Sequence, residues 1–268
     1  MKRKKVLYLD CSSGISGDMT LGSLLDLGID EAAFRKELLK LDFGGYELII
    51  KKIDKHSIRM TDFDVLLDSE REQSYETHNI SHNHIKASEH DHHHRNFNMI
   101  KEMIDSSDIS DNAKKTSIKI FTEIAIAEGK VHGKPLDEVH FHEVGAIDSL
   151  VDIVGTAICL DMLGVEEVYA SPLHEGTGTI QCKHGILPVP VPAVSEILAG
   201  SGIPVIHADA TTELVTPTGA GIAKCIVKEF GDMPPMTIEK VGYGSGKRDT
   251  GLFGAVRAFI GYSYSKQS

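Results

Sequence analysis

The stretch "KVLYLDCSSGISGDMTLGSLLDLG" (5–28) contains the strand–loop–helix pattern from which the fold is inferred. Its first part, "KVLYLD" (5–10), is a short apolar run that is typical of a buried strand. The next part, "CSSGISGD" (11–18), is a tight polar loop rich in Gly and Ser. Asp18 is expected to cap a helix that ends near Gly28. The stretch therefore predicts a strand that leads through a tight loop directly into a helix.

Helical and extended patterns alternate along the rest of the chain without a strict βαβ rhythm. Asp30 is expected to open a second helix, Ser110 and Thr216 are expected N-caps, and Pro217 suits a first helical position. Strands are predicted at 46–53, 60–68, 167–171, 177–182, 237–246 and 254–263. Helices are predicted within 96–107, 110–133, 139–164, 188–200 and 211–231. The expected class is α/β or α+β, a mixed sheet with packed helices and an inserted histidine-rich mobile loop.

Composition excludes several classes of protein. The chain has 268 residues, of which 41% are apolar and 25% charged, as in ordinary globular proteins. The net charge of −11 argues against nucleic acid as a partner, because a phosphate backbone is met by clustered Lys and Arg. No apolar stretch approaches the roughly 20 residues of a membrane span. The start of the chain lacks the features of a signal peptide, and a cytoplasmic protein is expected.

A histidine-rich tract, "THNISHNHIKASEHDHHHRN" (77–96), interrupts these patterns and suggests a division of the chain. We expect an N-terminal α/β subdomain at 1–76, a flexible loop at 77–96 and a main substrate and metal domain at 97–268. The four cysteines are far apart and form no CxxC pair, so neither a disulfide framework nor a thiolate zinc site is expected.

The loop after the first strand is the first candidate site. A Gly- and Ser-rich loop that opens a helix presents backbone N–H groups and hydroxyls at the positive helix end, which suits a phosphate. The loop has no GK[ST] sequence, so it is not a Walker loop. The alternative is a tight turn with a capping aspartate. The candidate ligand-binding residues here are Asp10, Ser12, Ser13, Gly14, Ser16, Gly17 and Asp18.

The second candidate is "HFHEVGAIDSLVD" (140–152), where histidines and carboxylates gather within a few residues. His140 and His142 share a face if the segment is extended. Asp148 and Asp152 are four residues apart and share a face of the following helix. Together with Glu143 they form the expected catalytic set, and the two histidines are expected metal ligands. The alternative is a polar network that holds a strand to a helix.

Glycine-rich turns form a third group, in "HEGTGTIQCKHGILPVPVP", "ELVTPTGAG" and "VGYGSGKRDTG". Glycine allows a ligand to approach the backbone closely, although glycines between strands are usually turn residues. Lys183, Lys247 and Arg248 are cations that suit a phosphate or carboxylate. From this group the expected ligand-binding residues are Thr216, Thr218, Gly244 and Lys247.

The tract itself is expected to collect metal ions. Imidazole suits nickel, zinc and copper, and the irregular spacing is typical of a flexible binder of several ions. The alternative is a solvated loop that binds metal incidentally. The expected ligands are His78, His82, His84, His90, His92, His93 and His94.

These motifs, in their order along the chain, resemble those of the nickel-insertion proteins of nickel-pincer cofactor synthesis, the LarC family. The resemblance rests on "CSSGISGDM", "VHFHEVGAIDSLVDI", "GTGTIQCKHGILPVPVPA", "ELVTPTGAG" and "GYGSGKRDTG". Family members also tend to carry a histidine-rich segment in this region.

The resemblance implies an enzyme of the lyase class, a cyclometallase, or its N-terminal part. It would insert nickel into pyridinium-3,5-bisthiocarboxylic acid mononucleotide and consume CTP, which yields the cofactor of lactate racemase. Longer family members continue into a C-terminal region to which CTP binding is attributed. CTP use is therefore expected to need that region as a partner, and homo-oligomer formation is left open.

A nickel storage protein or metallochaperone is the alternative function, with the tract as its working part. Several phosphate-compatible turns around convergent acids and histidines favour the enzyme, because a storage protein does not need them.

Overall fold

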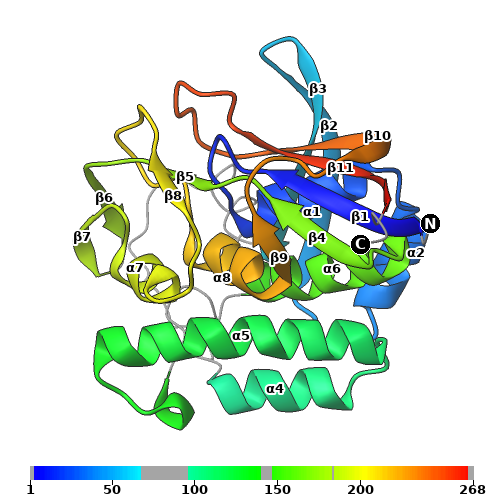
Figure 1. Ribbon diagram of the computed structural model, residues 1–268. Coiled ribbons are helices and arrows are strands. Elements are labelled where there is room, and N and C mark those ends of the chain that lie inside the picture. The colour runs from blue at the N-terminus through cyan, green and yellow to red at the C-terminus, as the bar shows by residue number, and fades with distance from the viewer. Residues whose placement is uncertain (1–2, 68–95, 140–146, 183, 265–268) are drawn as a thin grey trace, which may run out of the picture.

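The computed structural model describes residues 3–67, 96–139, 147–182 and 184–264. These residues form a mixed α/β fold in which helices pack on a seven-stranded sheet (Figure 1). The expected fold class is confirmed for the sheet and its helices. The histidine-rich tract lies outside the described residues.

The seven-stranded sheet combines strands from both ends of the chain. Its order is β2 (Tyr46–Lys55), β3 (Ile58–Leu67), β10 (Met236–Ser245), β11 (Ala255–Tyr264), β1 (Arg3–Asp10), β4 (Glu167–Ala170) and β9 (Val227–Phe230). The pairs β2–β3, β10–β11 and β1–β11 are antiparallel, whereas β3–β10, β1–β4 and β4–β9 are parallel. The expected ranges 1–76 and 97–268 thus both contribute strands to one sheet, and this division remains a prediction.

Seven α-helices are present among the described residues, and they lie beneath the sheet in the view of Figure 1. They are α1 (Gly17–Asp26), α2 (Glu31–Leu38), α4 (Phe97–Ser106), α5 (Asp111–His132), α6 (Ile147–Leu163), α7 (Pro192–Leu198) and α8 (Pro217–Ile226). Helix α1 packs on β10 and β3, and α6 packs on α1. The long helix α5 lies below α6, α7 and α8, and α4 packs on its far side (Figure 1).

Helix α1 lies very close to the backbone of β10. A Cβ on Gly244 would lie 1.9 Å from the carbonyl oxygen of Met19, and one on Gly242 would lie 2.1 Å from that of Ser23. Since no side chain fits there, these glycines bring the start of α1 against the sheet. Gly244, expected to bind ligand, has this packing role in the structure.

The helix starts follow the expected capping chemistry with one exception. Asp30, Ser110 and Thr216 are the N-caps of α2, α5 and α8, as predicted. The prediction for Asp18 was wrong. The N-cap of α1 is Ser16, whose hydroxyl accepts the amide of Met19, and this leaves the carboxylate of Asp18 for other contacts.

Short strands and one short helix surround the ends of the longer elements. β5 (Leu173–Glu175) pairs in parallel with β8 (Val205–His207), and β6 (Thr179–Cys182) forms a hairpin with β7 (Gly185–Pro188). A 3-10 turn, η1 (Leu136–Glu138), follows α5. The predicted loop-to-helix unit at 211–231 starts its helix at Pro217 as expected, but α8 ends at Ile226 and the chain continues as β9 beside β4.

A fully buried carboxylate, Glu175, joins β5 to the segment that precedes α8. Its Oε1 accepts the backbone amides of Gly176 at 2.9 Å, Leu214 at 2.8 Å and Val215 at 3.2 Å. Its Oε2 has no hydrogen-bond partner among the described residues. Burial raises the pKa of Glu175, and the three amides offset this only in part. Glu175 therefore holds in place the loop that leads to Thr216.

Two further findings concern the chain as a whole. Among the described residues, no helix has both the length and the apolar character that a membrane crossing requires. Each of the four cysteines lies in the described ranges and is a free thiol.

Candidate functional site

A pocket of about 770 Å³ opens at the N-terminal ends of α1, α6 and α8. Residues 16–18 of α1, Asp148, Ser149 and Asp152 of α6, and residues 216–218 of α8 line it. Backbone N–H groups at a helix N-terminus carry partial positive charge, so three such ends around one pocket favour an anionic ligand. The volume is in the range of small-molecule sites.

Asp152 lies directly against the first turn of α1. A Cβ on Gly17 would lie 2.4 Å from Oδ2 of Asp152, so Gly17 leaves the space that this carboxylate fills. Burial raises the pKa of Asp152 well above its ordinary value, and the charges of Asp18 and Asp148 raise it further. Carboxylates that repel one another in a sheltered pocket are stabilised by a proton or by a cation.

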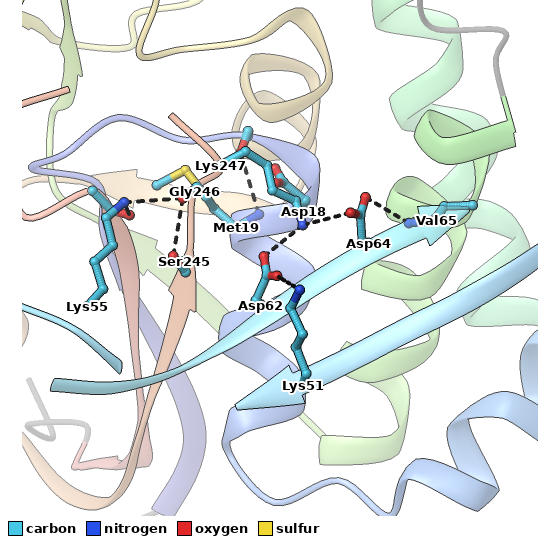
Figure 2. Close-up of polar contacts among 12 residues, drawn as sticks. Asp18, Met19, Lys51, Lys55, Asp62, Asp64, Val65, Ser245, Gly246 and Lys247 are labelled. Atoms are coloured by element: carbon cyan, nitrogen blue, oxygen red, sulfur yellow. Dashed lines mark hydrogen bonds and ion pairs between the residues drawn. The ribbon is translucent and has the colours of Figure 1, made fainter. Parts of the chain in front are cut away.

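Asp18 belongs to the same group of acids. The hydroxyl of Ser16 donates a hydrogen bond to Oδ1 of Asp18. Burial raises the pKa of Asp18, and the Ser16 hydrogen bond and the positive charge of Lys247 lower it in part. Figure 2 shows the Lys247 side chain beside Asp18. An acid group and a cation thus meet at the start of α1.

Lys247 is held by two aspartates of β3 (Figure 2). Its Nζ lies 2.7 Å from Oδ1 of Asp62 and 3.2 Å from Oδ2 of Asp64. The other oxygen of Asp62 lies 3.2 Å from Nζ of Lys51. Burial acts to lower the pKa of Lys247, but Asp62 and Asp64 outweigh it and raise the pKa. Lys247 is therefore a fixed positive charge at the pocket.

The loop between β10 and β11 carries Lys247 and is held by a lysine of β2. Nζ of Lys55 lies 3.2 Å from the carbonyl oxygen of Gly246 and 3.4 Å from those of Arg248 and Gly254. Figure 2 shows Lys55 extended toward Gly246. The ammonium group of Lys55 thus donates hydrogen bonds to three carbonyl oxygens of the β10–β11 loop, which reaches the pocket.

Arg248, on the same loop, lines the pocket beside Glu213. Its Nη1 lies 3.1 Å from Oε2 of Glu213, whose side chain is only 6% exposed. The pair links this loop to the segment that precedes α8.

The pocket lining continues to the end of α5 and the β6–β7 hairpin. Glu128 and His132 come from α5, and Cys182 and His184 come from the hairpin. The ring centres of the two histidines are 5.1 Å apart. Histidine, cysteine and glutamate side chains therefore also line this part of the pocket.

The structure brings together eight of the residues expected from the sequence. The pocket is lined by Ser16, Gly17, Asp18, Asp148, Asp152, Thr216, Thr218 and Lys247. Thr216 caps α8 by accepting the amide of Gly219 at 3.1 Å.

Other expected ligand-binding residues lie elsewhere. Asp10 bonds Arg257 across the β1–β11 pair, and this contact and the Ser12 amide lower its pKa although burial acts to raise it. Ser13 lines a smaller neighbouring pocket of about 230 Å³. Gly14 packs on the backbone of Leu214, where a Cβ would lie 2.2 Å from the carbonyl oxygen.

The remaining expected catalytic and metal-binding residues lie outside the described residues. These are His140, His142 and Glu143, and the tract residues His78, His82, His84, His90, His92, His93 and His94. Within the described ranges, no group of three or more His, Cys, Asp or Glu side chains is arranged to hold a metal ion.

Sequence reasoning missed several residues of the pocket, namely Asp64, Glu128, His132, His184 and Glu213. Glu128 and His132 are four residues apart and so share a face of α5, which was a usable signal. His184 lies within a glycine-rich motif that was noted only for its turns. Nothing local shows that α5 and the hairpin meet.

Comparison with known proteins identifies the family. Residues 7–268 match the family described as "Nickel insertion protein". The chain belongs to this family. No solved structure matches it.

Curated relatives of this family member bear more specific names. The chain is 54% identical to the "Pyridinium-3,5-bisthiocarboxylic acid mononucleotide nickel insertion protein" of Acetivibrio thermocellus, and the alignment covers 98% of the chain and 62% of that protein. A protein of the same name from Lactiplantibacillus plantarum is 49% identical, and the alignment covers 96% of the chain and 61% of that protein. The "Putative nickel insertion protein" of Dictyoglomus thermophilum is 43% identical over 96%, again with 61% covered. The chain thus spans about three fifths of the length of these relatives.

Proposed function

We propose that this chain takes part in inserting nickel into pyridinium-3,5-bisthiocarboxylic acid mononucleotide, the molecule in its relatives' names. One observation carries the proposal. The starts of three helices and the carboxylates of Asp18, Asp148 and Asp152 converge on one pocket of substrate size.

The substrate's charges suit this pocket. Its phosphate and thiocarboxylates are anions, which the N–H groups at the starts of α1 and α8 and the cation of Lys247 attract. The nickel ion is a cation that the aspartates attract. A pocket with both kinds of group can hold the two reactants side by side.

Insertion exchanges a proton for the metal. The ring C–H bond breaks, its electron pair forms the carbon–nickel bond, and two sulfurs bind the same ion. The released proton needs an acceptor, and Asp152 suits this role because its raised pKa makes its carboxylate a stronger base. The proposed ligands that present nickel are Asp148 and Asp152, with His140, His142 and Glu143 of the preceding segment.

Mixed histidine and carboxylate ligands also suit the release of nickel. Soft thiolates of the protein would compete with the sulfurs of the substrate, whereas imidazole and carboxylate give the ion up more readily. We propose a cyclometallase of the lyase class that uses CTP. Because the chain spans about 62% of a relative, CTP use is assigned to the part of the relatives that the chain does not match.

The test is mass spectrometry of the organic substrate after incubation with nickel and CTP. It is run with and without the part of the Acetivibrio thermocellus relative that this chain does not match. We expect the nickel-containing product only when that part is supplied. Asp152→Asn and Asp148→Asn should keep the fold by circular dichroism yet lose product even at saturating nickel.

A matched control is Asp54→Asn, since Asp54 is an exposed aspartate paired with Arg59 at 3.1 Å away from the pocket. It should keep wild-type turnover. Near-normal turnover in both pocket variants would refute the site. Nickel binding without product under any condition would favour storage or chaperone function.

A further inference from the structure

A smaller cavity, which we call the side cavity, adjoins the main pocket beside the β10–β11 loop. Its volume is about 230 Å³, below the roughly 300 to 1,000 Å³ of a whole small-molecule site, so it suits one part of a ligand. The two cavities share the lining residues Ser16, Asp18, Glu213, Thr216, Lys247 and Arg248. A ligand of the main pocket can therefore extend into the side cavity.

Three described segments that are far apart in the sequence form the walls of the side cavity. Ser13 belongs to the loop before α1, Glu213 to the segment before α8, and Arg248 to the β10–β11 loop. The first two segments are joined where the amide of Ile15 donates to the carbonyl oxygen of Leu214 at 2.9 Å. The third is joined to the second by Nη1 of Arg248, which donates to the carbonyl oxygen of Glu213 at 3.3 Å and to its Oε2 at 3.1 Å. The walls are thus fixed relative to one another.

Arg248 keeps most of its hydrogen-bond donors for a ligand. A guanidinium has five N–H donors, and the two on Nη1 serve the contacts with Glu213. Nε and Nη2 of Arg248 make no hydrogen bond with another residue that the structure describes. These two nitrogens form a planar edge whose parallel N–H groups match two oxygens of a phosphate. Glu213 is therefore a positioning residue that orients the guanidinium and leaves this edge to an anion.

The hydroxyl of Ser13 is a second donor in the side cavity. Ser13 is only 5% exposed, and within the described ranges its hydroxyl has no hydrogen-bond partner. Buried polar groups are normally hydrogen-bonded, so an unpartnered hydroxyl in a cavity wall favours a ligand that accepts its proton. A phosphate oxygen is such an acceptor.

Two acids also line the side cavity, and each of them is compensated. Glu213 is paired with Arg248. Asp18 accepts a hydrogen bond from the hydroxyl of Ser16, and burial raises the pKa of Asp18, which favours its neutral form. The positive charge of Lys247 lies beside Asp18 (Figure 2). The acids therefore do not prevent an anion from entering.

We propose that the side cavity binds the phosphate of the mononucleotide, held by Nε and Nη2 of Arg248 and by the hydroxyl of Ser13. The pyridinium ring and its thiocarboxylates then occupy the main pocket, which Asp148 and Asp152 line. CTP is the other source of phosphate, but a cavity of about 230 Å³ is small for a nucleoside triphosphate. This inference rests on the proposed function for the identity of the ligand, whereas phosphate-dependent binding is measured without any reaction.

The test is calorimetric titration with two probes that differ only in the phosphate. One is pyridinium-3,5-bisthiocarboxylic acid mononucleotide, and the other is its nucleoside, from which a phosphatase has removed the phosphate. The parent chain should bind the mononucleotide at least about tenfold more tightly, because charge-assisted hydrogen bonds to phosphate are strong.

Arg248→Met should remove at least about tenfold of the mononucleotide affinity and change the nucleoside affinity less than about twofold, because only the phosphate contacts Arg248. Ser13→Ala should weaken mononucleotide binding about threefold and leave nucleoside binding unchanged. The Arg248 side chain is 53% exposed, so its variant is expected to fold, and circular dichroism checks both variants.

Arg59→Met is the matched control. Nη1 of Arg59 also lies 3.1 Å from a carboxylate oxygen, that of Asp54, but Arg59 lines neither cavity. This variant should change the affinity for neither probe. Titration with CTP separates the two sources of phosphate, because Arg248→Met should leave any CTP affinity unchanged. Loss of CTP affinity with unchanged mononucleotide affinity would overturn the proposal.

The preference for the mononucleotide over the nucleoside decides the outcome. A parent without this preference, or a folded Arg248→Met variant that keeps it in full, would show that the phosphate lies elsewhere. If the parent makes no nickel product while Arg248→Met loses the preference, the proposed function fails and the phosphate site stands. If the parent makes product and the variant keeps the preference, the phosphate site fails alone.

Discussion

Gly17 shows how one missing side chain shapes the pocket. The sequence favoured a role for this glycine in the approach of a phosphate to the backbone. In the structure the group that fills the space beside Gly17 is the carboxylate of Asp152. A side chain at position 17 would therefore act on the arrangement of the acids as well as on an incoming ligand.

We expect Gly17→Ala to abolish nickel insertion and to destabilise the fold by about 1–3 kcal/mol, because the added methyl overlaps Asp152. Thermal unfolding and the product assay measure the two effects. Gly44→Ala is the control, since a Cβ there meets nothing within 4 Å, and it should change stability by less than about 0.5 kcal/mol. Wild-type turnover in Gly17→Ala would show that the position of Asp152 is not critical.

Glu175 gives a pH-dependent prediction at the same scale. Its pKa is raised in the folded state, so the folded chain holds the proton over a pH range in which the unfolded chain has lost it. Stability from this group is therefore present at low pH and declines as pH rises from the ordinary carboxyl pKa through the raised value. Glu175→Gln, which stays neutral, should gain stability relative to the wild type as pH rises above the ordinary carboxyl pKa.

Urea unfolding at several pH values measures that difference. Glu175→Ala is the contrasting variant, because it leaves three buried backbone amides without an acceptor and should cost at least about 2 kcal/mol at every pH. A Gln variant whose relative stability falls with rising pH would contradict the assigned direction.

At the scale of elements, the pocket depends on a loop that is held by hydrogen bonds from a residue outside the pocket. The β10–β11 loop carries Lys247 and Arg248, and Lys55 of β2 binds three of its carbonyls. Lys247, which lines the main pocket, thus lies on a loop held by a second lysine that does not line that pocket.

We expect Lys55→Met to release this loop, because the three carbonyls lose their shared donor. Amides of residues 246–254 should exchange hydrogen faster, and KM for the mononucleotide should rise more than kcat falls. Lys36→Met removes an exposed lysine from α2 and should change neither measure. Unaltered exchange in the loop would show that Lys55 is not what holds it.

Local patterns predicted individual elements well and their extent less well. Strands β1, β10 and β11 and the N-caps Asp30, Ser110 and Thr216 follow from local rules that the structure obeys. The segment "IVKEFG" continues the apolar run of α8, and periodicity does not separate its helical part from its extended part. Pairing with β4, a contact distant in the sequence, makes residues 227–230 a strand.

The candidate site was predictable where its residues are close in the sequence. Asp148 and Asp152 share a helix face, and residues 16–18 open a helix after a strand, so each group was visible in the chain. Their meeting was not visible, because it depends on α6 packing against α1. The same holds for His132 and His184, which belong to different elements.

At the scale of the whole molecule, the histidine-rich tract is expected to supply nickel and not to react. Replacing the seven histidines of residues 78–94 by serine should reduce the number of nickel ions bound per chain, because imidazoles there hold exchangeable ions. Product formation should slow when nickel is scarce and recover when nickel is abundant. A variant that stays inactive at every nickel concentration would place the tract in the reaction itself.

The pairing of β1 with β11 determines the order in which the molecule can be completed during synthesis. Arg3 lies opposite Tyr264, and β10 and β11 are also what join the β2–β3 hairpin to β1. The ribosome therefore releases β1 long before β11, its antiparallel partner, has been synthesised. The edges of the N-terminal strands stay unpaired until about 250 further residues have followed. The pocket that Lys247 lines is therefore incomplete until the loop between β10 and β11 has been synthesised.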